Sequence, residues 1–255
     1  MTDPSFWGWL AGGMGSLSKG IDLMSSIVGA QSDAELLSAV SAAASSCGFE
    51  RVLIGTQWIT PRGERCFQVL SGYPLEWQTA YAQRGYMGMD PTVAHCQVQT
   101  SSLIWTPNHF EQANAMELFE EARSFGLSCG MSVPIHEAAG VKTMVSLVRD
   151  KPLDADPGEL EQLVRAGELI GNVAHFSYRR LITPQIQGIL PKKLTQHELT
   201  ALRWVANGKT SWESSRIMNI SEATVIFHLN NAMKKLDVVN RPQAIAAAFR
   251  LGLLE

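Results

Sequence analysis

The most regular pattern of polar and hydrophobic positions lies near the C-terminus, where short apolar stretches follow polar helix caps. Thr195–Glu198 and Thr210–Glu213 each have the capping-box spacing that begins a helix. Ser221 is placed to cap a third helix that continues to Lys235, and a fourth short helix follows. Two helices joined by a turn of a few residues are typical of a helix-turn-helix. The pattern therefore predicts an all-α, four-helix domain of this kind over residues 194–255.

The third of these helices has two different faces. At about 100° per residue, its apolar positions form one seam of Val225, Leu229, Ala232 and Leu236. The opposite face holds Phe227, Asn230, Asn231 and Lys234, with Ile226 on its flank. Apolar groups that point away from the core suggest a binding partner. In a recognition helix they would contact thymine methyl groups, while Asn230 would contact a base edge and Lys234 a phosphate. The alternative is a plain helical bundle in which Phe227 folds onto a neighbouring helix, and it requires the caps and this face to coincide by chance.

The rest of the chain mixes helical and strand periodicities. Residues 1–30 are expected to be an N-terminal extension, because the glycines of 12–15 argue against one continuous helix and only a turn or two is amphipathic from Leu17. Helices are expected at 32–47, 75–83, 90–96, 116–125 and 157–180, and strands at 51–56, 66–70, 103–105, 129–136 and 142–148. This order, with a hairpin across 137–140, predicts an α+β domain over residues 31–180 with an antiparallel sheet covered by helices. Pro184 and Pro191 interrupt regular structure, so residues 181–193 are expected to be a linker.

Charge is unevenly distributed along the 255 residues. The net charge is −3, which alone gives no sign of nucleic acid. When the chain is divided after Pro191, the segment from Lys192 onward has nine Lys and Arg and five Asp and Glu, a net charge of +4. The rest of the chain has 12 Lys and Arg and 19 Asp and Glu, a net charge of −7. The basic character therefore coincides with the predicted helix-turn-helix, as DNA binding requires.

The cysteines give no sign of a metal site. Cys47, Cys66, Cys96 and Cys129 lie far apart, without a CxxC pair or a metal-like spacing to histidine, and are expected to be reduced, mostly buried thiols. The N-terminus lacks the basic region of a signal peptide, and no apolar stretch approaches membrane-spanning length. We therefore expect a cytoplasmic protein without a membrane partner.

Aromatic side chains gather around one carboxylate between residues 73 and 105. Tyr73, Trp77 and Tyr81 are spaced four residues apart, so they would share one face of a helix, and Asp90 and Trp105 follow. An apolar pocket with a few polar groups is the usual design of a small-ligand site. Aromatic residues on one helical face are more often core, however, and from this stretch alone core packing is the favoured interpretation.

Catalysis is the weaker interpretation of these residues. Asp90, a carboxylate beside aromatic rings, could act as a general acid of raised pKa, but no second carboxylate, activated nucleophile or phosphate-binding loop accompanies it. The glycines of 12–15 lack the strand and spacing of a dinucleotide site, and His95-Cys96 has no third group to orient it. No catalytic residue is therefore expected, and an enzyme is the less favoured class.

The C-terminal residues also carry a family resemblance. The DNA-binding domain of LuxR-type transcription regulators is similar in Leu194-Thr-x-x-Glu198, Trp204-x-x-x-Gly208-Lys-Thr, Ser221-Glu-x-Thr-Val-x-Phe-His228, Lys235-Leu and Asn240-Arg241. The DNA-contacting residues expected from pattern and resemblance together are Thr210, Thr224, Ile226, Phe227, Asn230, Asn231, Lys234 and Arg241. Two positions depart from the family. Ser214 replaces an aliphatic core residue and is expected to loosen packing, while Ile226 replaces a position that is often polar or basic and leaves the operator preference open.

The N-terminal part resembles the autoinducer-binding domain of the same regulators from about residue 36 to 136. The match rests on Tyr73-Pro-x-x-Trp77-x-x-x-Tyr81, Asp90-Pro91-Thr92, Trp105, Phe119-Glu-Glu-Ala-x-x-x-Gly126 and Gly130. The family's ligands are N-acyl homoserine lactones. The resemblance implies that Trp77 donates to the lactone carbonyl and Tyr73 to the amide carbonyl, while Asp90 accepts from the amide N–H. It places Ser132 and Ser146 near the acyl-chain head, adds Thr92 to the site, and makes an apolar wall of Tyr81, Trp105, Phe110 and Phe119.

These features together indicate a ligand-responsive transcription regulator. Its N-terminal domain would bind an acyl-homoserine lactone and no other cofactor, and its C-terminal domain would bind double-stranded DNA as a homodimer, since two-fold operators need two recognition helices. RNA polymerase is left open as a further partner. The alternatives are a receptor without a dedicated synthase, one tuned to another small molecule, or a repressor. A hydrolase of small lactones is the less favoured alternative from a different class. A response regulator is not expected, because the early acidic pair and spaced Asp and Lys of a receiver are missing.

Overall fold

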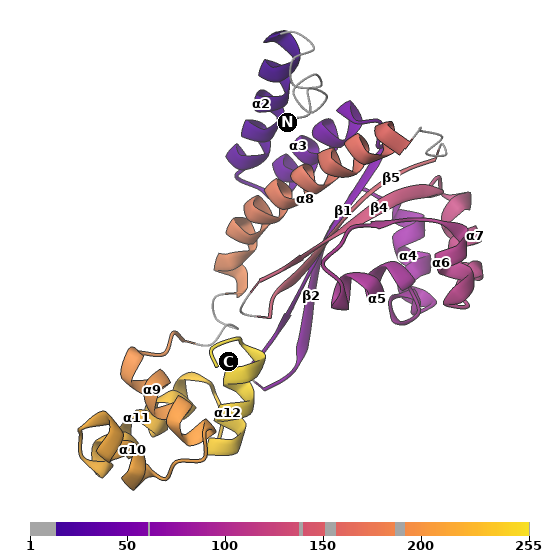
Figure 1. The fold of residues 1–255 in the computed structure, drawn as a ribbon. Helices are drawn as coiled ribbons and strands as arrows, with labels where there is room; N and C mark the ends of the chain where they lie inside the picture. Colours follow the sequence, from indigo (N-terminus) through magenta and orange to yellow (C-terminus); the bar gives the residue numbers. More distant parts are fainter. Residues whose placement is uncertain (1–13, 61, 138–139, 151–156, 187–191, 255) are drawn as a thin grey trace. The chain divides into compact units, whose positions relative to one another are not determined.

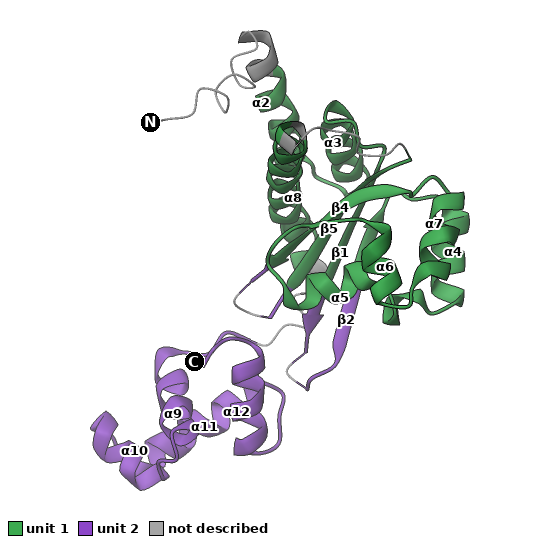
Figure 2. Cartoon of the chain, turned by 45° about the vertical axis from the view of Figure 1, so that its right-hand side comes forward, with its two compact units in different colours: residues 1–56, 68–135, 142–183 green, residues 57–67, 136–141, 184–255 purple. Residues whose placement is uncertain are grey.

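The computed structural model describes residues 14–60, 62–137, 140–150, 157–186 and 192–254. The chain divides into two compact units (Figure 2), of which the first comprises residues 1–56, 68–135 and 142–183, and the second residues 57–67, 136–141 and 184–255. The first unit combines most of a β-sheet with helices. The second contains the helices at the C-terminal end of the chain.

One antiparallel sheet of five strands has the order β2-β1-β5-β4-β3. The strands are β1 Arg51–Ile59, β2 Arg65–Ser71, β3 Leu103–Ile104, β4 Cys129–His136 and β5 Lys142–Arg149. In the β3–β4 pair, Leu103 lies opposite Ser132 and Ile104 opposite Met131. Every predicted strand is present, although β1 continues beyond its predicted end at residue 56. Residues 138–139 of the turn predicted between β4 and β5 lie outside the described part of the chain.

Helices cover both faces of the sheet (Figure 1). α3 (Asp33–Ser46) and α8 (Pro157–Ile186) lie along one face. The shorter helices lie on the other: α4 Leu75–Gln83, α5 Pro91–Val98, α6 Pro107–Gln112 and α7 Met116–Ser124, with a 3-10 turn, η1 Tyr86–Gly88, between α4 and α5. The predicted α+β class is confirmed. α6 and η1 were not predicted, because each is too short to show a helical repeat of apolar positions.

The side chains of β4 and β5 point alternately to the two faces of the sheet, and this decides which of them face the shorter helices. A Cβ on Gly167 of α8 would lie 2.4 Å from Met131 Sδ and 3.3 Å from Leu147 Cδ1, so these two strand residues face α8. Their neighbours Ser132 and Ser146 therefore point to the opposite face, because successive side chains of a strand alternate. Both serines are buried, with their hydroxyl oxygens 2.9 Å apart.

The N-terminal helix is longer than expected. α2 (Met14–Gly29) is one continuous helix that packs beside α3, so the prediction of only one or two turns is wrong for the described residues. Ile27 of α2 is fully buried. Packing against a neighbouring helix outweighs the low helix propensity of glycine. Gly12 and Gly13 of the predicted glycine break lie outside the described residues.

α8 also runs past its predicted end at residue 180. It continues to Ile186, so the first residues of the predicted linker are helical. Ile182 is fully buried, and packing of the helix therefore extends beyond Arg180. Pro184 lies in the last turn, where it cannot donate a backbone hydrogen bond to the carbonyl one turn earlier, and the helix ends two residues later at Ile186.

The second unit contains the four predicted helices: α9 Gln196–Ala206, α10 Ser211–Met218, α11 Glu222–Lys235 and α12 Arg241–Arg250. Both predicted capping boxes have reciprocal bonds, at Thr195–Glu198 and at Thr210–Glu213. Ser221 caps α11 by accepting from the backbone N–H of Thr224. The common core combines Leu202 of α9 with Leu229 of α11 and with alanines of α12.

Candidate functional site

The aromatic residues predicted around Asp90 come together against the shorter helices of the first unit. Trp77, Phe110 and Phe119 are buried in one cluster, and Tyr73, Tyr81 and Trp105 pack against it. The ring centroids of Trp77 and Tyr81 are 5.6 Å apart, and Phe110 stacks on Phe119 at 4.6 Å. These residues are therefore gathered as predicted, and their contact with a ligand stays a prediction.

Tyr73 does not share the helix of Trp77 and Tyr81, so the same-face prediction is wrong for this residue. α4 begins at Leu75 with Pro74 as its N-cap, and a residue before proline avoids the helical region. The Tyr73 hydroxyl is nevertheless buried, and it has no hydrogen-bond partner among the described residues. Burial raises the pKa of this hydroxyl, the Ser146 hydroxyl lowers it, and the Asp90 charge raises it further. A buried donor without an acceptor is costly, and a ligand oxygen would satisfy it.

Asp90 caps α5 and also faces the aromatic cluster. Its Oδ1 accepts from Thr92, from the backbone N–H at 2.8 Å and from the hydroxyl at 2.7 Å. Its Oδ2 accepts from the Tyr81 hydroxyl at 2.9 Å. Burial raises the pKa of Asp90, although the bonds from Thr92 and Tyr81 oppose it. Since a carboxylate oxygen has two lone pairs, Oδ2 retains the capacity to accept from a further donor.

Trp105 does more than form the apolar wall implied by the resemblance. Its indole Nε1–H donates to Ser132 Oγ at 2.9 Å, and Ser132 Oγ is bonded to Ser146 Oγ at 2.9 Å. Its backbone N–H donates to the Gly130 carbonyl at 2.8 Å, which fixes the residue at the end of β3. A row of polar groups thus crosses the site from Trp105 toward Tyr73.

Tyr86 belongs to the cluster and was not predicted. It is buried, its ring lies 6.0 Å from Trp77, and its hydroxyl donates to Glu121 Oε2 at 2.5 Å. Arg84 bonds to the other carboxylate oxygen of Glu121 at 3.2 Å, so this network ties η1 to α7. Tyr86 follows Gly85, whose φ is +67°, in an irregular turn, and no periodic pattern marks such a position.

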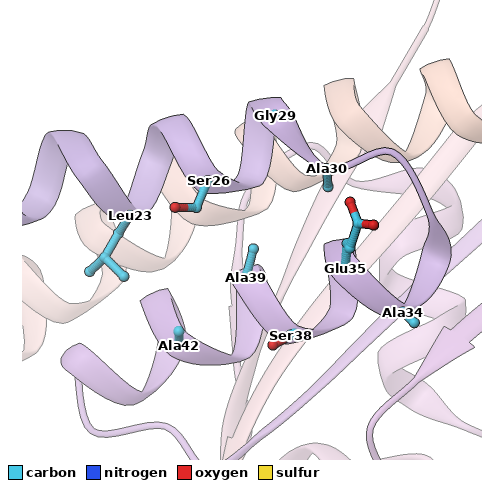
Figure 3. Close-up of a pocket in the computed structure, with 9 residues that line it drawn as sticks. All are labelled: Leu23, Ser26, Gly29, Ala30, Ala34, Glu35, Ser38, Ala39 and Ala42. Carbon is cyan, nitrogen blue, oxygen red and sulfur yellow. The ribbon is translucent and has the colours of Figure 1, made fainter.

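A groove of about 700 Å³ lies elsewhere, between α2 and α3 (Figure 3). Its walls are mostly small side chains such as Ala30, Ala34 and Ala39, with one carboxylate, Glu35. Glu35 Oε2 is already used, since it accepts from the backbone N–H of Gln31 at 2.9 Å. None of the predicted site residues lines this groove.

The two faces of α11 are as predicted. The seam residues Val225, Leu229, Ala232 and Leu236 are fully buried. Phe227 is 60% exposed and Ile226 is 37% exposed, while Asn230 and Lys234 are also exposed. The alternative in which Phe227 folds onto a neighbouring helix is therefore wrong. An apolar ring and two hydrogen-bonding side chains share an open helical face, which is the arrangement that a major groove accepts.

The other predicted DNA contacts lie at the N-cap of α10, within α11 and at the first residue of α12. Thr210 is exposed at the start of α10, and Thr224, Asn231 and Arg241 are half-buried. The Thr224 hydroxyl is bonded to the Ser221 hydroxyl at 2.7 Å, so it supports the helix cap. The turn between α10 and α11 depends on Asn219, whose φ of +53° is left-handed, a conformation that asparagine tolerates.

Two buried polar groups affect the stability of the second unit. Ser214 is 0% exposed and its hydroxyl has no partner among the described residues. The expected loosening of packing at this position stays a prediction. Glu198 accepts from Lys235 Nζ at 2.7 Å, which ties α9 to α11. Burial alone would raise the pKa of Glu198, but hydrogen bonds from Lys235 and Thr195 leave it lowered.

The cysteines are free thiols, but only Cys96 is buried. Cys47, Cys66 and Cys129 are half-buried, so the expectation of mostly buried thiols is wrong. Burial raises the pKa of Cys96 to about 12. Among the described residues, no group of three or more His, Cys, Asp or Glu could hold a metal ion. In the same part of the chain, no helix has the length and apolar character needed to cross a membrane.

Known proteins resemble the chain along almost its whole length. The family model of the autoinducer binding domain matches residues 32–181, and that of the luxR family of bacterial regulatory proteins matches residues 192–248. The transcriptional activator protein AnoR of Acinetobacter nosocomialis is 34% identical over 233 residues, which is 91% of this chain and 98% of AnoR.

Two solved structures share the fold. SdiA of Escherichia coli in complex with octanoyl-rac-glycerol has a TM-score of 0.71 at 22% identity, and the match covers 99% of this chain and 98% of SdiA. CepR2 of Burkholderia cenocepacia, described as an N-acylhomoserine lactone dependent transcription factor, has a TM-score of 0.58 at 23% identity over 65% of this chain and 96% of CepR2. At these identities the likeness concerns the fold alone.

Proposed function

Because the chain belongs to the LuxR family of bacterial transcription regulators, with an autoinducer-binding domain ahead of the DNA-binding domain, we propose that its autoinducer is an N-acyl homoserine lactone. As a homodimer in the cytoplasm, it controls quorum-sensing target promoters. Residues 31–180 bind the lactone, residues 181–193 link the domains, and residues 194–255 bind DNA. The family consists of transcription regulators, not enzymes.

The buried, unpartnered hydroxyl of Tyr73 is the observation that carries the proposed ligand class. It lies near the Asp90 carboxylate, whose charge acts on it and whose Oδ2 can accept a further bond. A donor beside an acceptor complements a secondary amide, which presents a carbonyl oxygen and an N–H on adjacent atoms. The amide of an acyl-homoserine lactone has both groups.

The remaining site residues complete this arrangement. The Trp77 indole donates to the lactone carbonyl, as the family resemblance implies. Tyr81 and Thr92 hold the Asp90 carboxylate in place, because both donate to it. The acyl chain then packs on the apolar cluster around Phe110 and Phe119, and Ser132 and Ser146 lie at its polar end.

DNA binding depends on the open face of α11. Phe227 and Ile226 contact thymine methyl groups, Asn230 reads a base edge, and Lys234 and Arg241 contact phosphate, with Thr210, Thr224 and Asn231 beside them. Two copies of the helix match a two-fold operator. AnoR is named a transcriptional activator, which supports activation and RNA polymerase as a further partner.

One specific observation favours a second candidate ligand. SdiA has the same fold and carries octanoyl-rac-glycerol in its solved complex. An acylglycerol has an ester where the lactone has an amide, so it has no amide N–H for Asp90. The second candidate function is therefore a regulator that senses an acyl compound of this kind.

A thermal-shift titration tests the proposal. The full chain is melted with N-butanoyl-, N-octanoyl- and N-dodecanoyl-homoserine lactone, and with octanoyl glycerol. A ligand that binds only the folded state stabilises it by about 2.7 kcal/mol at a hundred times its Kd, so at least one lactone should raise the melting temperature with concentration. No shift with any lactone contradicts the proposal, and a shift with octanoyl glycerol alone supports the second candidate.

Two matched tyrosine variants locate the site in the same assay. Tyr73→Phe removes the unpartnered hydroxyl and should reduce the lactone shift, because a neutral hydrogen bond contributes about 0.5–1.5 kcal/mol. Tyr178→Phe removes another buried, unpartnered hydroxyl, on α8 across the sheet, and should leave the shift unchanged. Equal loss in both variants would mean that Tyr73 is not a ligand contact.

A further inference from the structure

The residues of the proposed ligand site are almost completely buried. Trp77 and Phe119 are each 4% exposed, and Ser132 is 0% exposed. A ligand can reach such a site only when part of the surrounding structure moves away. The parts of a protein that move for this purpose are those of low local stability, with few buried contacts to their neighbours.

Residues 84–89, which connect α4 to α5, have this character. Five of these six residues are exposed, and Tyr86 alone is buried. The backbone N–H groups of Gly88 and Met89 donate to carbonyls of the same turn, those of Gly85 and Tyr86, at 3.2 and 3.0 Å. The segment can therefore move outward as a unit while these bonds within the turn stay intact.

Two side chains of the segment hold it against α7. The Tyr86 hydroxyl donates to Glu121 Oε2 at 2.5 Å, and Arg84 Nη2 lies 3.2 Å from Glu121 Oε1. Both carboxylate oxygens of Glu121 are thus bonded to the segment, and bonds to a charged acceptor are stronger than neutral ones. Arg84 also bonds to Glu117 at 2.9 Å, but the Glu117 side chain is 78% exposed, and surface pairs of this kind contribute little. Glu121 is therefore the main anchor of the segment on α7.

The segment also covers the groups that are proposed to hold the head of the ligand. The Tyr86 ring centroid lies 6.0 Å from that of Trp77 and 5.9 Å from that of Tyr81. Asp90 follows the segment directly, and its backbone N–H donates to the Tyr86 carbonyl at 2.9 Å. Outward movement of Tyr86 would uncover Trp77 and displace Asp90, so it would open the site at its polar end.

We propose that residues 84–89 are the gate through which the ligand enters and leaves, and that Glu121 is the latch that holds this gate closed through Tyr86. This inference rests on the proposed function and adds how access to its site is controlled. Glu121 is a positioning residue, because it acts through Tyr86 and needs no contact with the ligand. The latch sets the rates of binding and release, since the ligand passes only while the gate is open.

The substitution Glu121→Gln tests the latch through these rates. It keeps the size of the side chain but replaces the charged acceptor with a neutral one. The association and dissociation rate constants should rise together about three- to tenfold, the difference between a charged and a neutral hydrogen bond. Kd should therefore change less than either rate constant. A side chain that only supports packing would raise the dissociation rate constant alone.

The same helix offers a matched control. Glu117→Gln makes the same substitution on α7 and weakens a bond to the same Arg84, but it leaves the bond from Tyr86 to Glu121 in place. Because the Glu117 pair is exposed, both rate constants should stay within about twofold of those of the unmodified chain.

A third variant should act in the opposite direction. A Cβ on Gly88 would meet no atom within 4 Å, so Gly88→Ala fits the closed gate. Alanine has less backbone freedom than glycine and disfavours the open segment, so both rate constants should fall about two- to fivefold.

The experiment is stopped-flow tryptophan fluorescence of the full chain and its variants with the three lactones of the thermal-shift panel and with octanoyl glycerol. We expect paired acceleration in Glu121→Gln and none in Glu117→Gln. An unchanged association rate constant in Glu121→Gln, or equal acceleration in both variants, overturns the latch, while ligand binding by the unmodified chain still stands. If Glu121→Gln does not fold, unchanged rates in Gly88→Ala overturn the gate. If none of these ligands binds the unmodified chain, the proposed function fails and the inference fails with it.

Discussion

Replacing Asp90 by Asn should weaken lactone binding by about one to two orders of magnitude while the first unit stays folded. Asparagine is as good as aspartate at a helix N-cap, so its amide oxygen can keep both bonds from Thr92 and preserve α5. Its NH2 group then replaces Oδ2. The proposed ligand N–H would face a donor where it had a charged acceptor.

The magnitude follows from the bond that is lost. A hydrogen bond to a charged group contributes about 1.5–3 kcal/mol, and each 1.4 kcal/mol is about tenfold in Kd. Tyr81 should not add to this loss, because its hydroxyl, which donates to Oδ2, can turn and accept from the new NH2 group. The deficit therefore falls on the ligand.

The same substitution should not lower the melting temperature of the ligand-free chain. Burial raises the pKa of Asp90. A carboxyl group whose pKa is raised by folding contributes its full stability at pH values below the unfolded pKa. That contribution is lost as the pH rises through the folded pKa, so at neutral pH the buried charge destabilises the ligand-free fold. Asp90→Asn removes that charge, and an unchanged or higher melting temperature is the control for folding.

Calorimetric titration with the lactone that gives the largest thermal shift measures the effect. A Kd increase of the stated size with an undiminished ligand-free melting temperature supports the amide contact. A Kd equal to that of the unmodified chain would remove Asp90 from the ligand contacts. A large fall in the ligand-free melting temperature would refute the argument that asparagine preserves the cap.

Three further predictions concern the second unit. Ser214→Ala should raise its melting temperature in calorimetry, because a buried hydroxyl without a partner costs about 1–3 kcal/mol, and a lower value would mean that the hydroxyl has a partner. Because the pKa of Glu198 is lowered in the folded state, its ionised carboxylate stabilises the fold at pH values above the unfolded pKa of about 4.3. This stabilisation is lost as the pH falls through the folded pKa. Melting curves from neutral pH to pH 3 should therefore show an acid-induced loss that Glu198→Gln reduces, and equal curves would argue against the Lys235 pair. The third prediction is tested by anisotropy titrations with a selected operator and with random DNA. Lys234→Ala should weaken binding to both DNAs and reduce its salt dependence, whereas Asn230→Ala should chiefly relax the sequence preference. A loss of specificity alone from Lys234→Ala would contradict the placement of α11.

Local chemistry explains what the sequence predicted well. Both capping boxes depend on residues three apart, and the buried seam of α11 follows from helical periodicity alone. The aromatic cluster was predictable because its members recur within one short stretch. Their division into polar and apolar roles came from the family resemblance.

Long-range contacts explain the rest. The Trp105–Ser132 bond joins residues 27 apart and depends on the register of β3 against β4, and the Tyr86–Glu121 bond joins residues 35 apart. Neither distance is encoded in a local pattern. Packing also overrode local propensity, since α2 is continuous through Gly20 where it packs beside α3.

Mass spectrometry of small molecules that co-purify with the full chain tests the central claim most directly. The chain is produced in a bacterial host that makes several acyl-homoserine lactones, with Tyr73→Phe/Asp90→Asn prepared in parallel. We predict that one N-acyl homoserine lactone is retained in near-stoichiometric amount by the unmodified chain and is depleted from the double variant. Retention of an acylglycerol or another compound in its place, or of no small molecule, would contradict the claim that this regulator senses an acyl-homoserine lactone.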